Sequence, residues 1–325
     1  MKSLEGKVAV VAGATRGAGR GIACMLGEAG ATVYCTGRGT RERPSTTGVY
    51  AGRPETIDET AEMVSARGGV GLAVRTDHSD ESQVEALFKR VAEEHGRLDV
   101  LVNDISEGEQ HEWKPFWKLS TEKGLRMLRQ GVDTHIITTR HAAPLMVKRK
   151  GGLIVEIGDG DGLYHRGSLF YDLVKVTVAR LAYAWAEELH RHRVASLALT
   201  PGFMRTETVL EHFGATEENW REVAERSTKA RGYGFAGSET PFFVGRAVAS
   251  LAADREVLGK SGGLYSSWGL SEEYGFTDVD GSRPHWWSYF SEHFPQMLNA
   301  KPRTGLRWTI ERVAADEKKA EGSRQ

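Results

Sequence analysis

Cysteine is scarce in this chain, which has two cysteines among its 325 residues. Cys24 falls in a predicted helix and Cys35 in a predicted strand. This placement argues against a disulfide or a cysteine-based metal site and favours packed free thiols in a reducing compartment. We therefore expect a cytoplasmic protein without a disulfide framework.

Long hydrophobic runs are also missing. The apolar run after Gly6 is only about five residues long, too short for a signal sequence or a membrane span. No other segment is a better candidate. The expectation is a soluble protein that does not enter a membrane.

The chain has no surplus of one charge. Its 43 lysines and arginines are balanced by 44 acidic residues, and the basic residues are dispersed. Such a chain offers no electrostatic footprint for nucleic acid or for an acidic membrane surface. A small molecule is the expected partner.

Metal-binding motifs are incomplete. The stretches "DGDG" from Asp159 and "DVDG" from Asp278 lack the third acidic position and the closing glutamate of a calcium loop. His135, His141 and His165 are not spaced as metal ligands. We expect no metal ion.

Short apolar runs alternate with helical patterns along most of the chain. The runs predict buried parallel strands, and they are Val8 to Ala12, Thr32 to Tyr34, Val70 to Val74, Leu98 to Val102, Leu153 to Ile157 and Val194 to Leu199. This alternation predicts an α/β fold with one doubly wound parallel sheet and helices on both faces, the Rossmann fold. We place this cofactor-binding and catalytic domain at residues 1–270.

Two segments lie outside this alternation. The loop from Gly39 to Thr56 is expected to border the phosphate end of a cofactor. The extension at residues 271–325 is rich in Trp and Tyr and should cap the substrate side or pack on a neighbour before fraying from about Ala315.

The first predicted strand runs into the glycine-rich stretch "AGATRGAGRGIA", from Ala12 to Ala23. Gly13, Gly17 and Gly19 permit a tight turn and a close approach of the backbone to a ligand. A pyrophosphate could then bind at the N-terminus of the following helix. The position of this turn, after a strand and before a helix, favours a dinucleotide site.

Arginine takes the place of an acidic residue after the second predicted strand. "TVYCTGR" contains no Asp or Glu for a ribose 2′-hydroxyl, but it ends in Arg38, and Arg16 lies within the glycine turn. Two guanidinium groups suit a 2′-phosphate. The expected cofactor is NADP(H).

Tyr171 and Lys175 are four residues apart, which places both side chains on one face of a helix. The lysine can therefore act on the phenol. Asp159 lies twelve residues before the tyrosine in a glycine-spaced turn. It could serve the reaction, or it could cap that turn through backbone hydrogen bonds, a role that suits Asp.

Several of these motifs, in this order, resemble those of the short-chain dehydrogenase/reductase family, from about Lys7 to Leu270. The glycine turn is similar to the family's TGxxxGxG, "LVNDIS" takes the place of its NNAG, "YDLVK" matches its Tyr-x-x-x-Lys, and "PGFMRT" matches its Pro-Gly-x-x-x-Thr. The resemblance implies that Tyr171 is the general acid. Lys175 would lower the pKa of Tyr171 and hold the nicotinamide ribose.

The resemblance also implies a set of cofactor contacts. Asp77 would contact the adenine, and Pro201, Gly202 and Thr206 would border the nicotinamide amide and the phosphates. The full expected set is Gly13, Thr15, Arg16, Gly17, Ala18, Gly19, Arg38, Asp77, His78, Asn103, Tyr171, Lys175, Pro201, Gly202, Met204 and Thr206. Members of the family usually form homodimers or homotetramers through the helices that here carry Pro144 and Tyr171.

Three departures from the family pattern bear on the chemistry. Asp159 stands where the family usually has its active-site serine, and Gly131 stands where a helix asparagine usually completes a proton relay. In "LVNDIS" only Asn103 of the usual four residues remains. By this resemblance the proton-donating pair, Tyr171 and Lys175, is retained, and Asp159 takes the place of the residue that polarises the carbonyl.

Three functions remain open. The first is NADPH-dependent reduction of a C=O group in a small, fairly hydrophobic substrate. The second is reduction of a C=N bond aided by Asp159, since pteridine reductases resemble this chain and carry an aspartate in the serine's place. The third is an NADP-binding protein with reduced catalysis.

A helical pattern between Thr206 and Thr240 predicts a lid over the nicotinamide.

Overall fold

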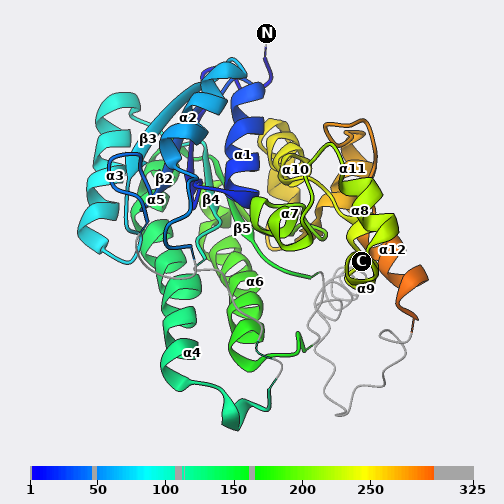
Figure 1. The fold of residues 1–325 in the computed structure, drawn as a ribbon. Helices are drawn as coiled ribbons and strands as arrows, with labels where there is room; N and C mark the ends of the chain where they lie inside the picture. Colours follow the sequence, from blue (N-terminus) through cyan, green and yellow to red (C-terminus); the bar gives the residue numbers. More distant parts are fainter. Residues whose placement is uncertain (1, 46–49, 107–111, 113, 161–164, 296–325) are drawn as a thin grey trace, which may run out of the picture.

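The computed structural model describes residues 2–45, 50–106, 112, 114–160 and 165–295. Seven parallel strands form one sheet in the order β3-β2-β1-β4-β5-β6-β7 (Figure 1). The strands are β1 (Val8–Ala12), β2 (Thr32–Gly37), β3 (Val70–Arg75), β4 (Val100–Asn103), β5 (Gly152–Ile157), β6 (Val194–Thr200) and β7 (Leu264–Ser266). The predicted doubly wound α/β fold is confirmed.

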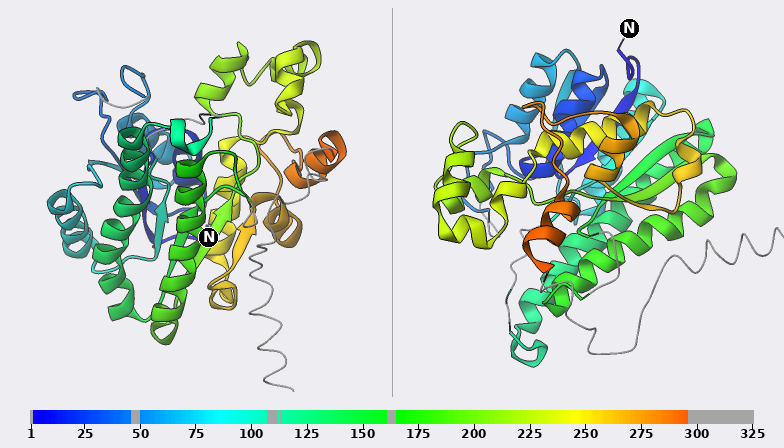
Figure 2. Two further views of the ribbon diagram at one scale, coloured as in Figure 1. Left: turned by 90° about the horizontal axis from the view of Figure 1, so that it is seen from below. Right: turned by 90° about the vertical axis from the view of Figure 1, so that its right-hand side faces the viewer.

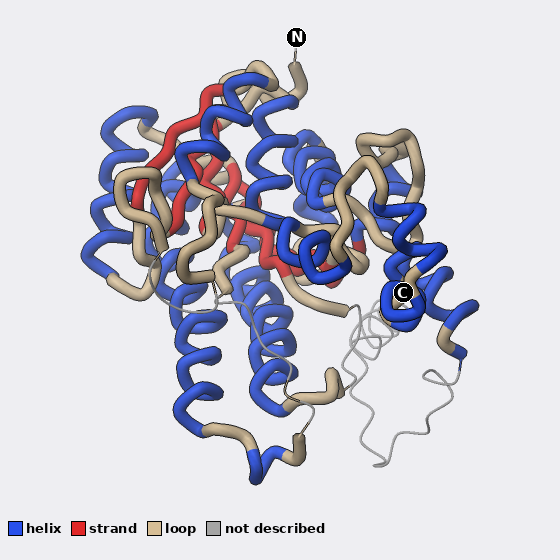
Figure 3. Tube along the Cα trace, in the orientation of Figure 1, coloured by secondary structure: helices blue, strands red, loops and turns tan. Residues whose placement is uncertain are grey.

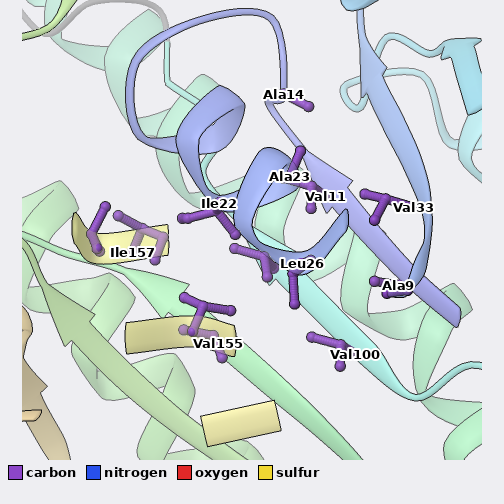
Figure 4. Packing of buried hydrophobic residues seen from close by; sticks show 14 of the residues in the cluster. Ala9, Val11, Ala14, Ile22, Ala23, Leu26, Val33, Val100, Val155 and Ile157 are labelled. Carbon is purple, nitrogen blue, oxygen red and sulfur yellow. The ribbon is translucent and has the colours of Figure 1, made fainter. Parts of the chain in front are cut away.

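Helices cover both faces of the sheet, and Figure 3 shows the strands running between them. One face carries α1 (Gly17–Glu28), α2 (Ile57–Ala66), α10 (Pro241–Ala253) and α11 (Ser267–Tyr274). The other face carries α3 (Glu81–His95), α5 (Thr134–Arg149) and α6 (Leu169–Leu189). In the first layer, Ile22 and Leu26 of α1 pack on Val11 and Val155 of the sheet (Figure 4).

The inner strands β1 and β6 owe their place to continuous apolar runs. All residues of β1 and β6 are buried, as expected for parallel strands covered by helices on both faces. A capping residue starts the helix after β3, because the side chain of Asp80 accepts hydrogen bonds from the N–H groups of Ser82 and Gln83. Because the strands are parallel, the segments that follow them all begin at the same edge of the sheet.

The segment before α5 is interrupted. It contains η1 (Phe116–Lys118), α4 (Thr121–Leu128) and one π-helical turn, η2 (Arg129–Asp133), that leads into α5. Gly131, at the expected position of the family's helix asparagine, lies in this π turn. Turns of this kind are rare in proteins as a whole, and those that occur are often found at functional sites.

A small lobe follows β6. It consists of α7 (Glu207–Phe213), α8 (Trp220–Arg226), α9 (Thr228–Gly232) and η4 (Phe235–Gly237). The lobe has an apolar core of its own around Trp220 and Phe235. Figure 2 shows it beside the sheet, with α12 (Trp286–His293) of the C-terminal extension next to it. The helical pattern after Thr206 thus forms three short helices.

The remaining elements are the short 3-10 helices η3 (His190–His192) and η5 (Val257–Lys260). Both cysteines are buried as thiols, and burial raises the pKa of Cys24 to about 11. Among the described helices, none is both long and apolar enough to cross a bilayer. Across the same residues, no three metal-ligating side chains come together. Ala315, the predicted start of fraying, lies outside the described residues.

Candidate active site

The glycine turn after β1 is packed against the backbone that follows β4. Gly13 has a φ of +96°, and a Cβ there would lie 2.3 Å from the carbonyl oxygen of Asp104. A Cβ on Gly19 would lie 2.3 Å from the carbonyl oxygen of Gly13. Side chains are excluded at both positions, so the backbone is open to a ligand at the start of α1.

The N-terminus of α1 is not capped by a side chain of its own turn. Arg16 is the N-cap residue and makes no capping hydrogen bond. The first N–H groups of the helix therefore point outward with the positive end of the helix dipole, an arrangement that fits a pyrophosphate. Ala18 is buried in the same first turn. The residues present fit a dinucleotide here.

The glycine turn also touches the end of β2. A Cβ on Gly37 would lie 2.6 Å from the hydroxyl of Thr15. Arg16 and Arg38 therefore lie on adjacent segments, Arg16 after β1 and Arg38 after β2. Arg38 is half-buried.

Two residues of the Gly39 to Thr56 loop contact Arg16 and a third, Arg53, binds one of them; the sequence interpretation named none of the three. Arg16 Nε donates to Glu55 at 3.3 Å, and its guanidinium lies 4.3 Å from the centre of the Tyr50 ring. Glu55 also accepts from Arg53 at 2.7 and 3.0 Å. Arg16 Nη2 is buried and has no hydrogen-bond partner among the described residues. This arrangement leaves donor capacity for an anion.

The residues after β3 are engaged locally. The carboxylate of Asp77 accepts hydrogen bonds from the backbone and hydroxyl of Ser79. The His78 ring is buried between Thr36 and Thr138, each at 2.8 Å, and burial lowers its pKa to about 3. The ring of His78 is therefore a neutral part of the core.

A buried polar network lies behind the end of β4. Asn103 Nδ2 donates to Glu156 at 2.5 Å and to Thr139 at 2.9 Å. The other carboxylate oxygen of Glu156 lies 2.5 Å from His135 Nδ1. Burial acts to lower the pKa of His135, but Glu156 outweighs it and raises the pKa above its usual value. His135 Nε2 contacts the Ile105 carbonyl at 3.1 Å, which helps fix the backbone beside Gly13.

Tyr171, Lys175 and Asp159 come together on α6 and the turn before it. The Tyr171 hydroxyl donates a hydrogen bond to Asp159 Oδ2, and Tyr171 is buried. Lys175 Nζ lies 5.6 Å from the centre of the Tyr171 ring. The structure thus brings these three side chains together, with the Asp159 carboxylate directed at the phenol.

The turn that carries Asp159 is anchored from two sides. Gly160 N donates to the hydroxyl of Thr200, at the end of β6, at 2.7 Å. Arg166 Nε donates to the carbonyl oxygen of Asp159 at 2.6 Å, and Arg166 also pairs with Asp172 at 3.3 Å. These bonds hold the carboxylate in place without using its oxygens.

The loop after β6 contains the other expected cofactor contacts. Pro201 and Gly202 follow Thr200, Met204 forms a bridge with Glu239, and Thr206 caps α7 by accepting from the N–H of Val209. A Cβ on Gly202 would lie 2.7 Å from Glu239 Oε2 and 2.9 Å from Trp286 Cβ. The loop is thus held between a buried carboxyl group and the C-terminal extension.

Glu239 is fully buried, and sequence reasoning did not single it out. Ser267 Oγ donates to its Oε2 at 2.7 Å, while its Oε1 has no hydrogen-bond partner in the described part of the chain. Burial raises the pKa of Glu239 to about 8. Glu239 is therefore protonated over most of the neutral range.

Aromatic rings continue from the Gly202 loop into the extension. The Phe203 ring lies 5.7 Å from that of Trp286 and 6.4 Å from that of Phe235. Trp286 stacks on Tyr289 at 6.0 Å. The cluster that includes Trp286, Trp287, Tyr289 and Phe290 thus packs on the lobe after β6 through Trp286.

Comparisons with known proteins show what the chain and its fold are similar to. A model of the short chain dehydrogenase family matches residues 7–216. The mouse protein named dehydrogenase/reductase SDR family member 1 is 37% identical over 86% of this chain and 85% of its own length. The 7α-hydroxysteroid dehydrogenase of Clostridium sardiniense is 30% identical over 65% of this chain and 76% of its own. A solved short chain dehydrogenase from Mycobacterium thermoresistibile has a TM-score of 0.70 at 21% identity, covering 87% of this chain and 92% of that one.

Proposed function

Because the chain belongs to the short-chain dehydrogenase/reductase family, whose members are oxidoreductases that use NAD(P)(H), we propose that it reduces a C=O group of a small, fairly hydrophobic substrate with NADPH. The observation that carries this proposal is the grouping of Tyr171, Lys175 and Asp159 at the carboxyl edge of the sheet. The bound cofactor would supply the hydride. The chain would supply the proton and hold the substrate.

Tyr171 is the proton donor in this proposal. Tyr171 is buried, its hydroxyl is oriented by one carboxylate, and in this proposal the Lys175 ammonium, 5.6 Å from the centre of the ring, stabilises the phenolate after proton transfer. The hydroxyl must turn from Asp159 to the substrate oxygen for that transfer. Asp159, if ionised, competes with a carbonyl oxygen for the proton, and if protonated it can donate to that oxygen itself, as serine does in the family.

A second candidate is the reduction of a C=N bond, and the Tyr171–Asp159 hydrogen bond favours it. A carboxylate at this position would stabilise a protonated iminium carbon–nitrogen bond for hydride attack. The same charge would oppose the alkoxide formed from a ketone. The substrate class therefore depends on whether Asp159 carries a charge during the reaction.

The preference for NADPH over NADH is supported by the arginines near the end of β2. Arg16 and Arg53 share one carboxylate, Glu55, and Arg53 also pairs with Glu211, so these four charges balance, while Arg16 Nη2 is buried and has no hydrogen-bond partner among the described residues. Arg38 follows β2 directly, where an acidic residue would favour the ribose hydroxyl of NADH. A 2′-phosphate would find both charge and hydrogen-bond donors there.

Self-association in the cytoplasm is part of the proposal. Ile136 on α5 is 45% exposed and Leu173 on α6 is 41% exposed, large values for apolar side chains. Both belong to the helix pair through which the family usually assembles. A homodimer or homotetramer would bury them, and light scattering tests this, because a monomer at micromolar concentration would contradict it.

The discriminating experiment is an NADPH oxidation assay on matched ketone and imine substrates, with Tyr171→Phe as the control. Turnover of ketones that is lost in the variant supports the first proposal. Turnover of imines alone supports the second. Binding of NADPH with no turnover on either class would indicate a cofactor-binding protein with reduced catalysis and would overturn both.

A further inference from the structure

A glutamate of the lobe reaches the N-terminus of α1. Glu207 is the first residue of α7, and its Oε2 accepts a hydrogen bond from Gly17 N at 2.9 Å. Its other oxygen lies 3.5 Å from Nη1 of Arg20. The Glu207 side chain is 28% exposed, so the carboxylate is partly shielded from water.

Gly17 is the first residue of α1, and its N–H belongs to the group of helix donors that have no partner within the helix. Those donors and the positive end of the helix dipole are what a pyrophosphate would use. The Glu207 carboxylate and a dinucleotide pyrophosphate therefore compete for the same N–H and for the same favourable field. They also repel each other.

A second contact joins α7 to the cofactor-binding side. Arg53 donates to Glu211, one turn after Glu207, at 2.7 Å, and it also holds Glu55. The Arg53–Glu211 pair involves no backbone donor of α1. It can persist when Glu207 leaves the helix end, so of these two polar contacts of α7 one conflicts with the cofactor and one does not.

We propose that Glu207 is a cofactor-affinity determinant that acts as a displaceable internal anion. Its carboxylate satisfies the end of α1, and a bound pyrophosphate expels it and releases the first turn of α7. Arg53 keeps the rest of α7 attached through Glu211. Arg20, which also donates to Thr15 O at 2.9 Å and Glu59 at 2.6 Å, stays beside the pyrophosphate.

This proposal rests on the family's use of a nicotinamide dinucleotide and not on the choice of NADPH or of a C=O substrate. Its test is calorimetric binding of ADP and of adenosine to the wild type and to Glu207→Gln. The glutamine keeps a neutral acceptor for Gly17 N but removes the charge. The variant should bind ADP about tenfold more tightly, while adenosine, which has no phosphate, should bind equally to both proteins.

Glu211→Gln is the matched control, because it removes the same charge from the same helix without touching Gly17. A tightening for ADP in Glu207→Gln that exceeds the tightening in Glu211→Gln by severalfold supports the proposal. Equal tightening in both variants would assign the effect to net charge and overturn it. Unchanged or weaker ADP binding by a Glu207→Gln protein with a normal melting curve would overturn it as well.

The proposed NADPH preference is judged by a separate measurement, the ratio of NADPH to NADH affinity in the wild type. A preference for NADH would end that assignment and leave the role of Glu207 standing. Failure of the wild type to bind ADP at all would overturn the role of Glu207.

Discussion

The hydroxyl of Tyr171 donates its hydrogen bond to the carboxylate of Asp159, which stands twelve residues earlier in the chain. The proposed proton donor is thus oriented by a carboxylate that accepts its hydrogen bond. Arg166 and Thr200 fix the turn around Asp159, so the carboxylate cannot be treated as a surface group. In the proposed reaction, this pair decides between a C=O and a C=N substrate.

Tyr171→Phe should lower kcat by at least about a hundredfold and leave NADPH affinity within about twofold of wild type. Lys175→Ala should lower both kcat and NADPH affinity, because the lysine is proposed to stabilise the phenolate and to hold the nicotinamide ribose. Steady-state kinetics and fluorescence titration separate the two effects. Equal loss of cofactor binding in Tyr171→Phe would contradict this division of roles.

Asp159→Asn should lower kcat on the true substrate by about a hundredfold or more, since it removes a positioned acid or charge. Asp159→Ser should shift the ratio of kcat/KM toward simple ketones, because serine donates to a carbonyl oxygen without repelling an alkoxide. Both variants are assayed at saturating NADPH. Rates close to wild type in both would show that the aspartate is structural.

Arg38→Asp should weaken NADPH binding by about a hundredfold, because a charge-assisted contact to the 2′-phosphate becomes a repulsion. NADH should be affected much less. Arg41→Asp is the matched control, since Arg41 is exposed and pairs with Glu62 on α2. A similar loss of NADPH affinity in both variants would indicate a general charge effect.

Folding stability should fall as the pH rises through the range in which Glu239 ionises. Burial raises the pKa of Glu239 from 4.5 to about 8 in the folded chain, so the folded state binds this proton more tightly than the unfolded state. Between these two values the contribution of Glu239 to stability falls by up to about 1.4 kcal/mol per pH unit and is constant above them. Below pH 4.5 Glu239 is protonated in both the folded and the unfolded state, so stability no longer depends on pH through this residue.

Glu239→Gln should remove that slope while keeping an acceptor for Ser267. Urea unfolding at pH 5, 6.5 and 8 gives the comparison. Relative to the wild type, the free energy of unfolding of the variant should increase by a few kcal/mol between pH 5 and pH 8. Parallel pH curves for the two proteins would exclude Glu239 as the ionising group.

Gly202→Ala should lower the free energy of unfolding by about 1 to 3 kcal/mol. The new methyl group would lie 2.7 Å from Glu239 and 2.9 Å from Trp286, so the extension must shift. Gly259→Ala is the control, because nothing lies within 4 Å of a Cβ there. Equal stability changes in the two variants, measured by urea unfolding, would contradict tight packing at Gly202.

The sequence predicted those parts of the fold that local patterns specify. The apolar runs of β1 and β6 are readable because their causes lie within a few residues. The three-residue strand β7 was missed, since its pairing with β6 depends on tertiary contact and its residues are only half-buried. The lid pattern was read correctly as helical, but its division into three short helices follows from the core around Phe235.

The candidate site divides in the same way. Tyr171 and Lys175 were predictable because helical spacing places them on one face, and Asp159 because family order places it nearby. Glu207 was not predictable, since its partner Gly17 is 190 residues away in the chain. Arg53 and Glu55 were missed for a related reason, because charged residues in a polar loop give no signal until the loop folds back on Arg16.

The packing of Trp286 on Gly202 and Phe203 has a consequence for biosynthesis. A ribosome completes β6 on the order of ten seconds before it makes α12, given common elongation rates. During that interval strands β1 to β6 can pair, but the Phe203 side chain lacks its cover from the extension. A nascent chain at this stage would expose the apolar surface that Trp286 later covers, so we expect chaperones to bind it until the extension has been made.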